Sequence, residues 1–93
     1  MTIDFSSVHN HHEQAVFDQV TALTSRYPSL NAELLVDAAC IALNKLKAHY
    51  IRHDVDLTFY MPDGQREQNA IDVRAAVQAA LAFVQSRELA KRG

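Results

Sequence analysis

The sequence has few of the residues that interrupt helices or cross-link a chain. Its 93 residues include two glycines, two prolines, one cysteine and no tryptophan. Because turns depend on glycine and proline, their scarcity favours a helical chain with few turns. The single cysteine, Cys40, excludes a disulfide within the chain.

Long apolar runs and an excess of basic residues are also missing. No run approaches the roughly 18 to 20 apolar residues that a membrane-spanning helix needs, and the first residues lack the apolar core of an export signal. The formal net charge is -2, whereas a general nucleic-acid coat protein needs a basic balance. We therefore expect a cytoplasmic protein with no membrane association and no direct DNA binding.

The length of the chain fits one domain over residues 1–93. A domain of this size buries only a modest fraction of its surface, so dimerisation would stabilise it considerably. Residues 1–7 and 88–93 are expected to be loose ends of this domain.

Apolar residues at spacings of three and four predict a helix on each side of the central stretch. The first covers about residues 8–26, with Ser6 or Ser7 as its N-cap, and it ends before Pro28 because proline disfavours helical geometry at the preceding residue. The last follows a turn signal at 62–64. Its apolar positions are Ile71, Val73, Val77, Ala80, Leu81 and Val84.

The central stretch, about residues 31–47, predicts a helix that is apolar on nearly every side. Asn31 suits its N-cap, and only Asp37, Asn44 and Lys45 are polar between residues 34 and 46. A helix that is hydrophobic all round belongs inside its fold, and Cys40 would behave there as a small hydrophobic residue. The expected fold is mainly α, with three or more helices around this buried central helix.

Residues 50–60 change to the period of a half-buried strand. One strand needs a partner, since an unpaired edge invites association. Two arrangements stay open: pairing with the same segment of a second copy around a twofold axis, or an extended but irregular segment over the helices. The residues on the apolar side of this alternation are Ile51, His53, Val55, Leu57 and Phe59.

The run from Asp37 to Tyr60 resembles the core of the late competence development ComFB family. That family has an acidic residue before a small-residue helix, then Ala-Leu-Asn, a basic residue and Leu, usually two prolines, and a Tyr. The matching positions here are Asp37, Ala42, Leu43, Asn44, Lys45, Leu46 and Tyr50. The run from Tyr50 to Asp56 is similar to the branch of the family found in Gram-negative bacteria. Near the N-terminus, Asn10 and Glu13 are similar to the Asn-x-x-Glu that opens the family's first helix.

The resemblance implies a dimerising, mainly helical protein that binds a cyclic dinucleotide, chiefly cyclic di-GMP (c-di-GMP), without catalysis. It links the protein to competence, type IV pilus motility or a surface lifestyle, with a downstream protein that the sequence does not identify. The nucleotide-binding positions it suggests are Asn44, Lys45, Tyr50, Arg52, His53 and Asp54. With a twofold pairing of residues 50–60, the expected dimer interface is Asp37, Ile51, Val55, Leu57 and Phe59.

The chemistry of these residues suits such a ligand. A twofold dimer would present two copies of Arg52 to a symmetric dianion, and arginine offers planar bidentate contacts to phosphate or guanine. Asp54 would accept the N–H pair of guanine, and Tyr50 or Tyr60 would stack a base. Asp54 and Asp56 are not accompanied by an activated nucleophile or a glycine-rich phosphate loop, so we expect no enzyme activity.

The chain departs from the family at one corner. The two prolines are replaced by the Lys47-Ala48-His49 run, which leaves the central helix free to run longer. The zinc-binding cysteine cluster of some relatives has no counterpart beyond Cys40. A homodimeric adaptor that binds a protein and no nucleotide is the alternative function.

A metal site is a weaker hypothesis. His9, His11 and His12 would be its ligands, but a zinc site needs about four ligands in tetrahedral order, and a solvated helix start is the preferred interpretation. No metal or cofactor is expected.

Overall fold

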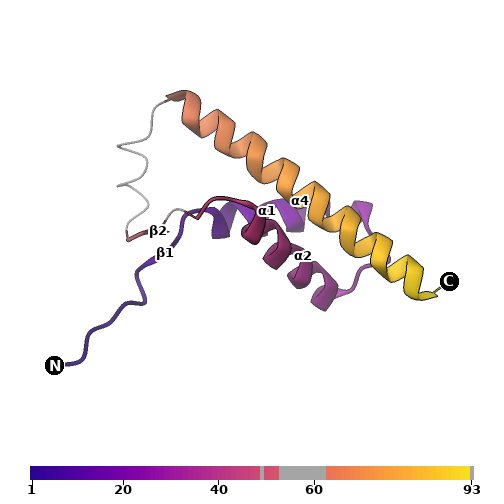
Figure 1. The fold of residues 1–93 in the computed structure, drawn as a ribbon, viewed down its shortest axis with the longest axis horizontal. Coiled ribbons are helices and arrows are strands. Elements are labelled where there is room, and N and C mark those ends of the chain that lie inside the picture. The colour runs from indigo at the N-terminus through magenta and orange to yellow at the C-terminus, as the bar shows by residue number, and fades with distance from the viewer. Residues whose placement is uncertain (49, 53–62, 93) are drawn as a thin grey trace.

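The fold, seen in a computed structural model that describes residues 1–48, 50–52 and 63–92, is mainly helical, as the sequence predicted (Figure 1). The predicted helices around a central one are confirmed, and a short two-stranded sheet accompanies them. The elements in order are β1 (His9–Asn10), α1 (His12–Leu23), the 3-10 helix η1 (Thr24–Arg26), α2 (Ala32–Lys45), β2 (Tyr50–Ile51) and α4 (Asp63–Arg92).

The core lies where α1, α2 and α4 meet. On α4, buried residues recur at spacings of three and four, and the largest fully buried side chains of the domain are Leu81, Val77 and, on α1, Val16. Alanines on α2 and α4 let the helices approach closely, since Ala42 and Ala80 are 0% exposed. The other buried apolar residues are Val20, Leu30, Ala38, Ala39, Val73, Ala76 and Val84.

Helix α2 begins as predicted and ends slightly early. The Asn31 side chain accepts a hydrogen bond from the backbone N–H of Leu34 at 2.9 Å, so Asn31 is the N-cap. The helix ends at Lys45, and Leu46 takes an extended conformation with φ -90° and ψ 143°. The helix therefore stops about two residues before the expected end near 47, although no proline follows Leu46 to force the stop.

The burial of α2 is one-sided in the single chain. Ala38 and Ala42 are almost fully buried against the other helices, whereas Val36 is 68% exposed. Cys40 is exposed as well, so its expected burial as a small hydrophobic residue is wrong for the single chain. The reason is geometric: α1 and α4 pack on α2 from two directions and leave a third side of this apolar helix uncovered.

The start of α1 differs from the prediction. The helix begins at His12, not near residue 8, and Ser6 and Ser7 lie in a turn before it, so neither is an N-cap. Instead, the buried side chain of Asn10 accepts a hydrogen bond from the backbone N–H of His12 at 3.2 Å. At the other end, η1 carries the helical path to Arg26, where Pro28 predicted that it would stop.

The extended segment has its partner in the same chain. Tyr50–Ile51 forms β2 and pairs antiparallel with β1, with His9 opposite Ile51 and Asn10 opposite Tyr50. The predicted strand over 50–60 is thus seen at its first two residues, and residues 53–62 lie outside the described part of the chain. Strand β1 has only two residues, which is too short to show the alternation of apolar and polar residues that identifies a strand. The sequence therefore did not predict this pairing.

Helix α4 is longer than the body it packs on. Its first turns extend beyond the other helices (Figure 1), and Ile71, expected on the packing face, is 60% exposed. Polar i,i+4 pairs support this overhang, because the Gln65 amide donates to Asn69 at 2.8 Å and Gln68 to Asp72 at 2.9 Å. At the other end α4 continues to Arg92. Among the described residues, no helix is both long and apolar enough to span a membrane.

Candidate functional site

The predicted nucleotide residues gather where α2 ends and β2 begins, a segment from Asn44 to Arg52 that we call the corner. Asn44, Lys45, Tyr50 and Arg52 are all exposed there, and Tyr50 is 71% exposed. Tyrosine usually buries much of its ring, so this ring is available to stack on a ligand. His53 and Asp54 lie outside the described residues.

Positive charge is concentrated at the corner. Lys45, Lys47 and Arg52 are exposed cations within this short segment. Lys45 is in the last turn of α2, where a cation also stabilises the negative end of the helix dipole. Lys47 and Arg52 follow the helix and have no such structural role, so they are the cations best placed to meet an anionic ligand.

Strand β1 adds N-terminal residues to the corner. Residues opposite each other in an antiparallel pair share a face, so His9 lies beside Ile51. His9 also lines a hollow of about 490 Å³ on α1, together with His11, Glu13 and Asp18. From the sequence, these histidines were interpreted as a separate cluster, whereas the structure brings His9 to β2, opposite Ile51 and adjacent to the strand position of Tyr50.

The family-like Asn10 and Glu13 have structural positions at this junction. Asn10 is 9% exposed and holds the start of α1 through His12, and Glu13 is in the first turn of that helix, where an acidic residue suits the dipole. The two residues that resemble the family's first helix therefore lie where β1 connects to α1. A sequence signal for the site was present here, but it could not indicate which segment β1 would pair with.

The metal hypothesis gains no support from the described residues. Among them, no group of three or more His, Cys, Asp or Glu side chains is placed to hold a metal ion. His12 is only 4% exposed and its ring lies 5.4 Å from that of His11, in a tilted contact. The N-terminal histidines thus belong to the packing at the start of α1.

A second surface, which the sequence did not predict, lies between α1 and α2. This α1/α2 groove has a volume of about 730 Å³. Val20 and Ala39 are buried in it, and Phe17 and Val36 are 45% and 68% exposed. The remaining lining residues are Thr21, Thr24, Ala32, Leu35, Cys40, Leu43 and Asn44.

Asn44 connects the groove with the corner. Its amide N–H donates to the Cys40 sulfur at 3.8 Å, one turn back along α2. The groove was missed because α2 was expected to be buried on every side. The sequence did carry a signal for the groove: α2 has more apolar positions than the two helices packed against it can cover.

The predicted dimer interface is only partly described. Asp37 is exposed, and Ile51 is half-buried in β2. Asp37 also lines a smaller cavity of about 280 Å³ between α2 and the end of α4, with Arg87, Glu88 and Lys91 around it. Val55, Leu57 and Phe59 lie outside the described residues.

Comparison with known proteins gives one match. The family described as late competence development protein ComFB matches residues 9–88, which includes β1, the corner and almost all of α4. Searches of curated proteins and of solved structures gave no match. Since the matched segment covers most of the 93 residues, the chain belongs to the ComFB family.

Proposed function

We propose that this protein is a non-catalytic receptor for a cyclic dinucleotide, with c-di-GMP as the first ligand to test. It acts as a homodimer and passes its signal to a downstream protein. Membership of the ComFB family suggests a competence-related role, and type IV pilus motility and surface lifestyle are related outputs. The observation that supports the receptor is the exposure of Tyr50, Arg52 and Lys47 together at the corner.

Each of these residues suits one part of the ligand. A guanidinium makes bidentate contacts to a phosphate or to a guanine edge, which is the task of Arg52. The Tyr50 ring stacks a purine, a contact worth roughly 1 to 3 kcal/mol per base. Lys47 adds charge toward the phosphates. In a twofold dimer, two corners would meet the two equivalent halves of the ligand.

The β1–β2 pair supports this proposal because it holds the corner before any ligand arrives. Pairing of Asn10 with Tyr50 fixes the backbone at the stacking residue, and the Asn10 side chain is tied to the start of α1. A site whose backbone is already ordered loses less conformational entropy on binding. In this proposal, the strand pair orients Tyr50 and Arg52 toward the ligand.

Titration calorimetry with c-di-GMP and with cyclic di-AMP tests the receptor. We expect heat with c-di-GMP, and an affinity at least tenfold weaker for Arg52→Ala in a protein that remains dimeric. Tyr50→Ala should weaken binding by roughly 5- to 150-fold, from the stacking energy above. Arg74→Ala is the matched control, because Arg74 is an exposed arginine on a different element, α4. Absence of heat with both nucleotides at high micromolar concentration would exclude the receptor.

A homodimeric adaptor is the second candidate, and the exposed apolar α1/α2 groove favours it. Contiguous apolar surface of this kind marks interaction sites for proteins. In an adaptor, the corner cations would serve contacts between copies, so Arg52→Ala would weaken the dimer itself. Sedimentation of the Arg52→Ala and Arg74→Ala variants, compared with their calorimetry, separates the two functions.

A further inference from the structure

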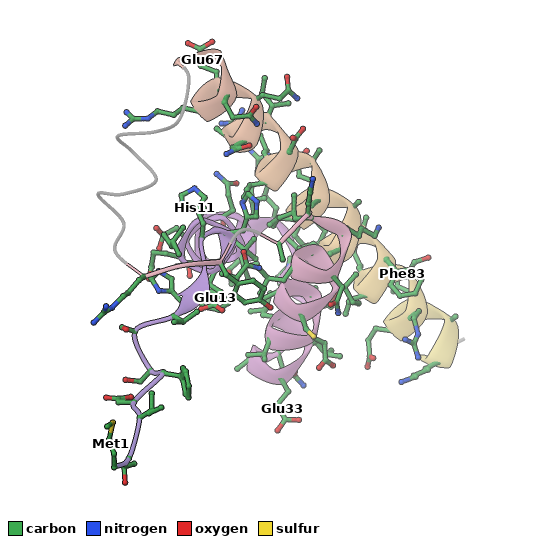
Figure 2. All side chains as sticks on the ribbon, turned by 60° about the vertical axis from the view of Figure 1, so that its left-hand side comes forward. Met1, His11, Glu13, Glu33, Glu67 and Phe83 are labelled. Atoms are coloured by element: carbon green, nitrogen blue, oxygen red, sulfur yellow. The ribbon has the colours of Figure 1, made fainter. Side chains whose placement is uncertain are left out.

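The first residues of the chain form an exposed arm that the proposed receptor does not use. Residues 1–8, the N-terminal arm, stand clear of the helices in both views, with Met1 at the tip (Figure 2). Met1, Ile3 and Phe5 alternate with polar residues, and Ile3, Phe5 and Val8 are 63%, 70% and 47% exposed. Apolar side chains at alternate positions are typical of an extended segment that lies against a surface.

The arm has a defined base. The Val8 N–H donates to the Phe5 carbonyl at 3.0 Å, and the Asp4 carboxylate accepts the Ser6 N–H at 2.8 Å. These bonds make a turn at the base of the arm, next to β1, which is itself held by β2. The turn and the strand pair set the direction in which the arm leaves its own body.

The α1/α2 groove is complementary to the arm in size and chemistry. Its 730 Å³ is within the range of about 300 to 1,000 Å³ of pockets that hold small apolar ligands. Its wall is apolar at Phe17, Val36 and Leu43, and its polar groups are hydroxyls and one amide, without a charged side chain among the lining residues. An aromatic and an aliphatic side chain, such as Phe5 and Ile3, suit this lining.

We propose that the N-terminal arm of one copy docks into the α1/α2 groove of a second copy, and that the exchange is reciprocal about a twofold axis. The inference deepens the homodimer of the proposed function and rests on it in that respect, but it does not depend on nucleotide binding. The second copy is the occupant because the arm points away from its own helices in Figures 1 and 2.

The area involved is a large share of what a stable dimer needs. A buried phenylalanine contributes roughly 150 to 250 Å², so Phe5 with Ile3 and Val8 contributes about 350 Å² from each arm. The groove contributes less than the arm, and two symmetric contacts together bury roughly 1,000 Å². Specific interfaces bury about 1,200 to 2,000 Å², so reciprocal arm exchange supplies most of this area and contacts between the two bodies supply the rest.

Cys40 makes a direct test possible, because it lines the groove and is the only cysteine. A Ser7→Cys/Cys40→Ser chain carries its thiol on the arm alone, and it is mixed with the wild type, whose thiol is in the groove. After mild oxidation without nucleotide, we expect a disulfide-linked pair of the two chains at several times the yield given by an Ile71→Cys/Cys40→Ser control. Equal yields would overturn the proposal.

The same reagents identify competing arrangements. If each arm lay in its own groove, the mixture would give no linked pair, and Ser7→Cys with Cys40 intact would form a disulfide within one chain. If two grooves faced each other without arms, the wild type alone would give a Cys40–Cys40 dimer as the main product. Either result overturns arm exchange.

Sedimentation equilibrium provides the second measurement. We expect Phe5→Ser and Val36→Glu each to raise the dimer dissociation constant at least tenfold, while Ile71→Ser, an exposed apolar residue outside the groove, changes it less than twofold. All three positions are exposed in the single chain, so circular dichroism should show an unchanged helical fold. A monomeric wild type, or dimers unaffected by Phe5→Ser, would overturn the inference, and calorimetry with c-di-GMP would report separately on the receptor.

Discussion

Leu81 is the residue on which the packing of α4 can be tested most directly. It is 0% exposed and lies on the α4 face that packs on α1 and α2. Truncation to alanine keeps the helix former and removes about three carbons from the core. The change therefore probes packing between helices and leaves the intrinsic stability of α4 almost untouched.

The structure allows the magnitude to be worked out. At about 0.8 kcal/mol for each buried methylene, the lost transfer free energy is roughly 2.4 kcal/mol. The unfilled cavity adds to it, and buried Leu→Ala changes cost about 2.7 to 5 kcal/mol in total. A chain of 93 residues has a free energy of unfolding of roughly 5 to 14 kcal/mol. We thus expect Leu81→Ala to remove about 3 kcal/mol, roughly a fifth to three fifths of the total.

Urea unfolding followed by circular dichroism measures this loss, at one fixed protein concentration because association also contributes to stability. With a slope of about 1 to 1.5 kcal/mol/M, the midpoint should fall by roughly 2 to 3 M. Ile71→Ala is the matched control, since Ile71 is on the same helix but 60% exposed, and it should change stability by less than about 0.5 kcal/mol. Equal losses in the two variants would refute the assigned packing face of α4.

Three further predictions concern the helix starts and the arm. Asn31→Ala removes the N-cap of α2 and should cost about 1 kcal/mol in the same unfolding assay, and recovery in Asn31→Asp would confirm the capping role. Asn10→Ala removes a buried amide that accepts the first N–H of α1, so it should cost about 1 to 2 kcal/mol, and no loss would contradict that role. The Asp4 carboxylate accepts the backbone N–H of Ser6 and its hydroxyl, which holds the pKa of Asp4 below its ordinary value of 3.8. The carboxylate therefore favours the turn above that pH, and the turn weakens as the pH falls through the lowered pKa; carbon NMR of Asp4 against pH should show it, and an ordinary midpoint would refute the bond.

Local sequence rules predicted those parts of the fold that depend on neighbouring residues. Asn31 capped its helix as expected because a cap needs only the next three residues, and Pro28 ended the first helical path because it restricts the residue before it. The start of α1 was missed because Ser6 and Ser7 are equally good turn formers. In the structure the Asp4 carboxylate accepts the Ser6 backbone N–H in a turn. Ser6 is therefore part of a turn and does not cap a helix, although serine suits both positions.

Features that depend on the whole chain were less accessible. The all-round apolar character of α2 predicted complete burial, but burial requires enough neighbouring helices, and the described part of the chain packs two, α1 and α4, against it. Val36 and Cys40 remain exposed for that reason. Likewise, the strand character at Tyr50 was recognised, yet its partner His9–Asn10 is about 40 residues away and has no pattern of its own.

For the candidate site, the family resemblance suggested six nucleotide-binding residues, of which the structure describes Asn44, Lys45, Tyr50 and Arg52. Tyr50 and Arg52 are exposed at the corner, as a ligand site requires, although exposure alone does not specify a ligand. The α1/α2 groove was not foreseen because its existence depends on how α1 and α2 diverge. Sequence spacing indicates which residues share the α1 face of Phe17 or the α2 face of Val36, not whether these two faces enclose a space.

The two-residue pairing of β1 with β2 has a thermodynamic consequence. On one side β1 continues into the arm, and its partner β2 carries Tyr50. So short a ladder opens at low cost compared with the helical core, and a ligand that requires the closed pair would stabilise it by about 2.7 kcal/mol at a hundred times its dissociation constant. Coupling between two binding sites is reciprocal. If a ligand at the corner raises the affinity of the arm for its groove by some factor, docking of the arm raises the affinity of the corner for the ligand by the same factor.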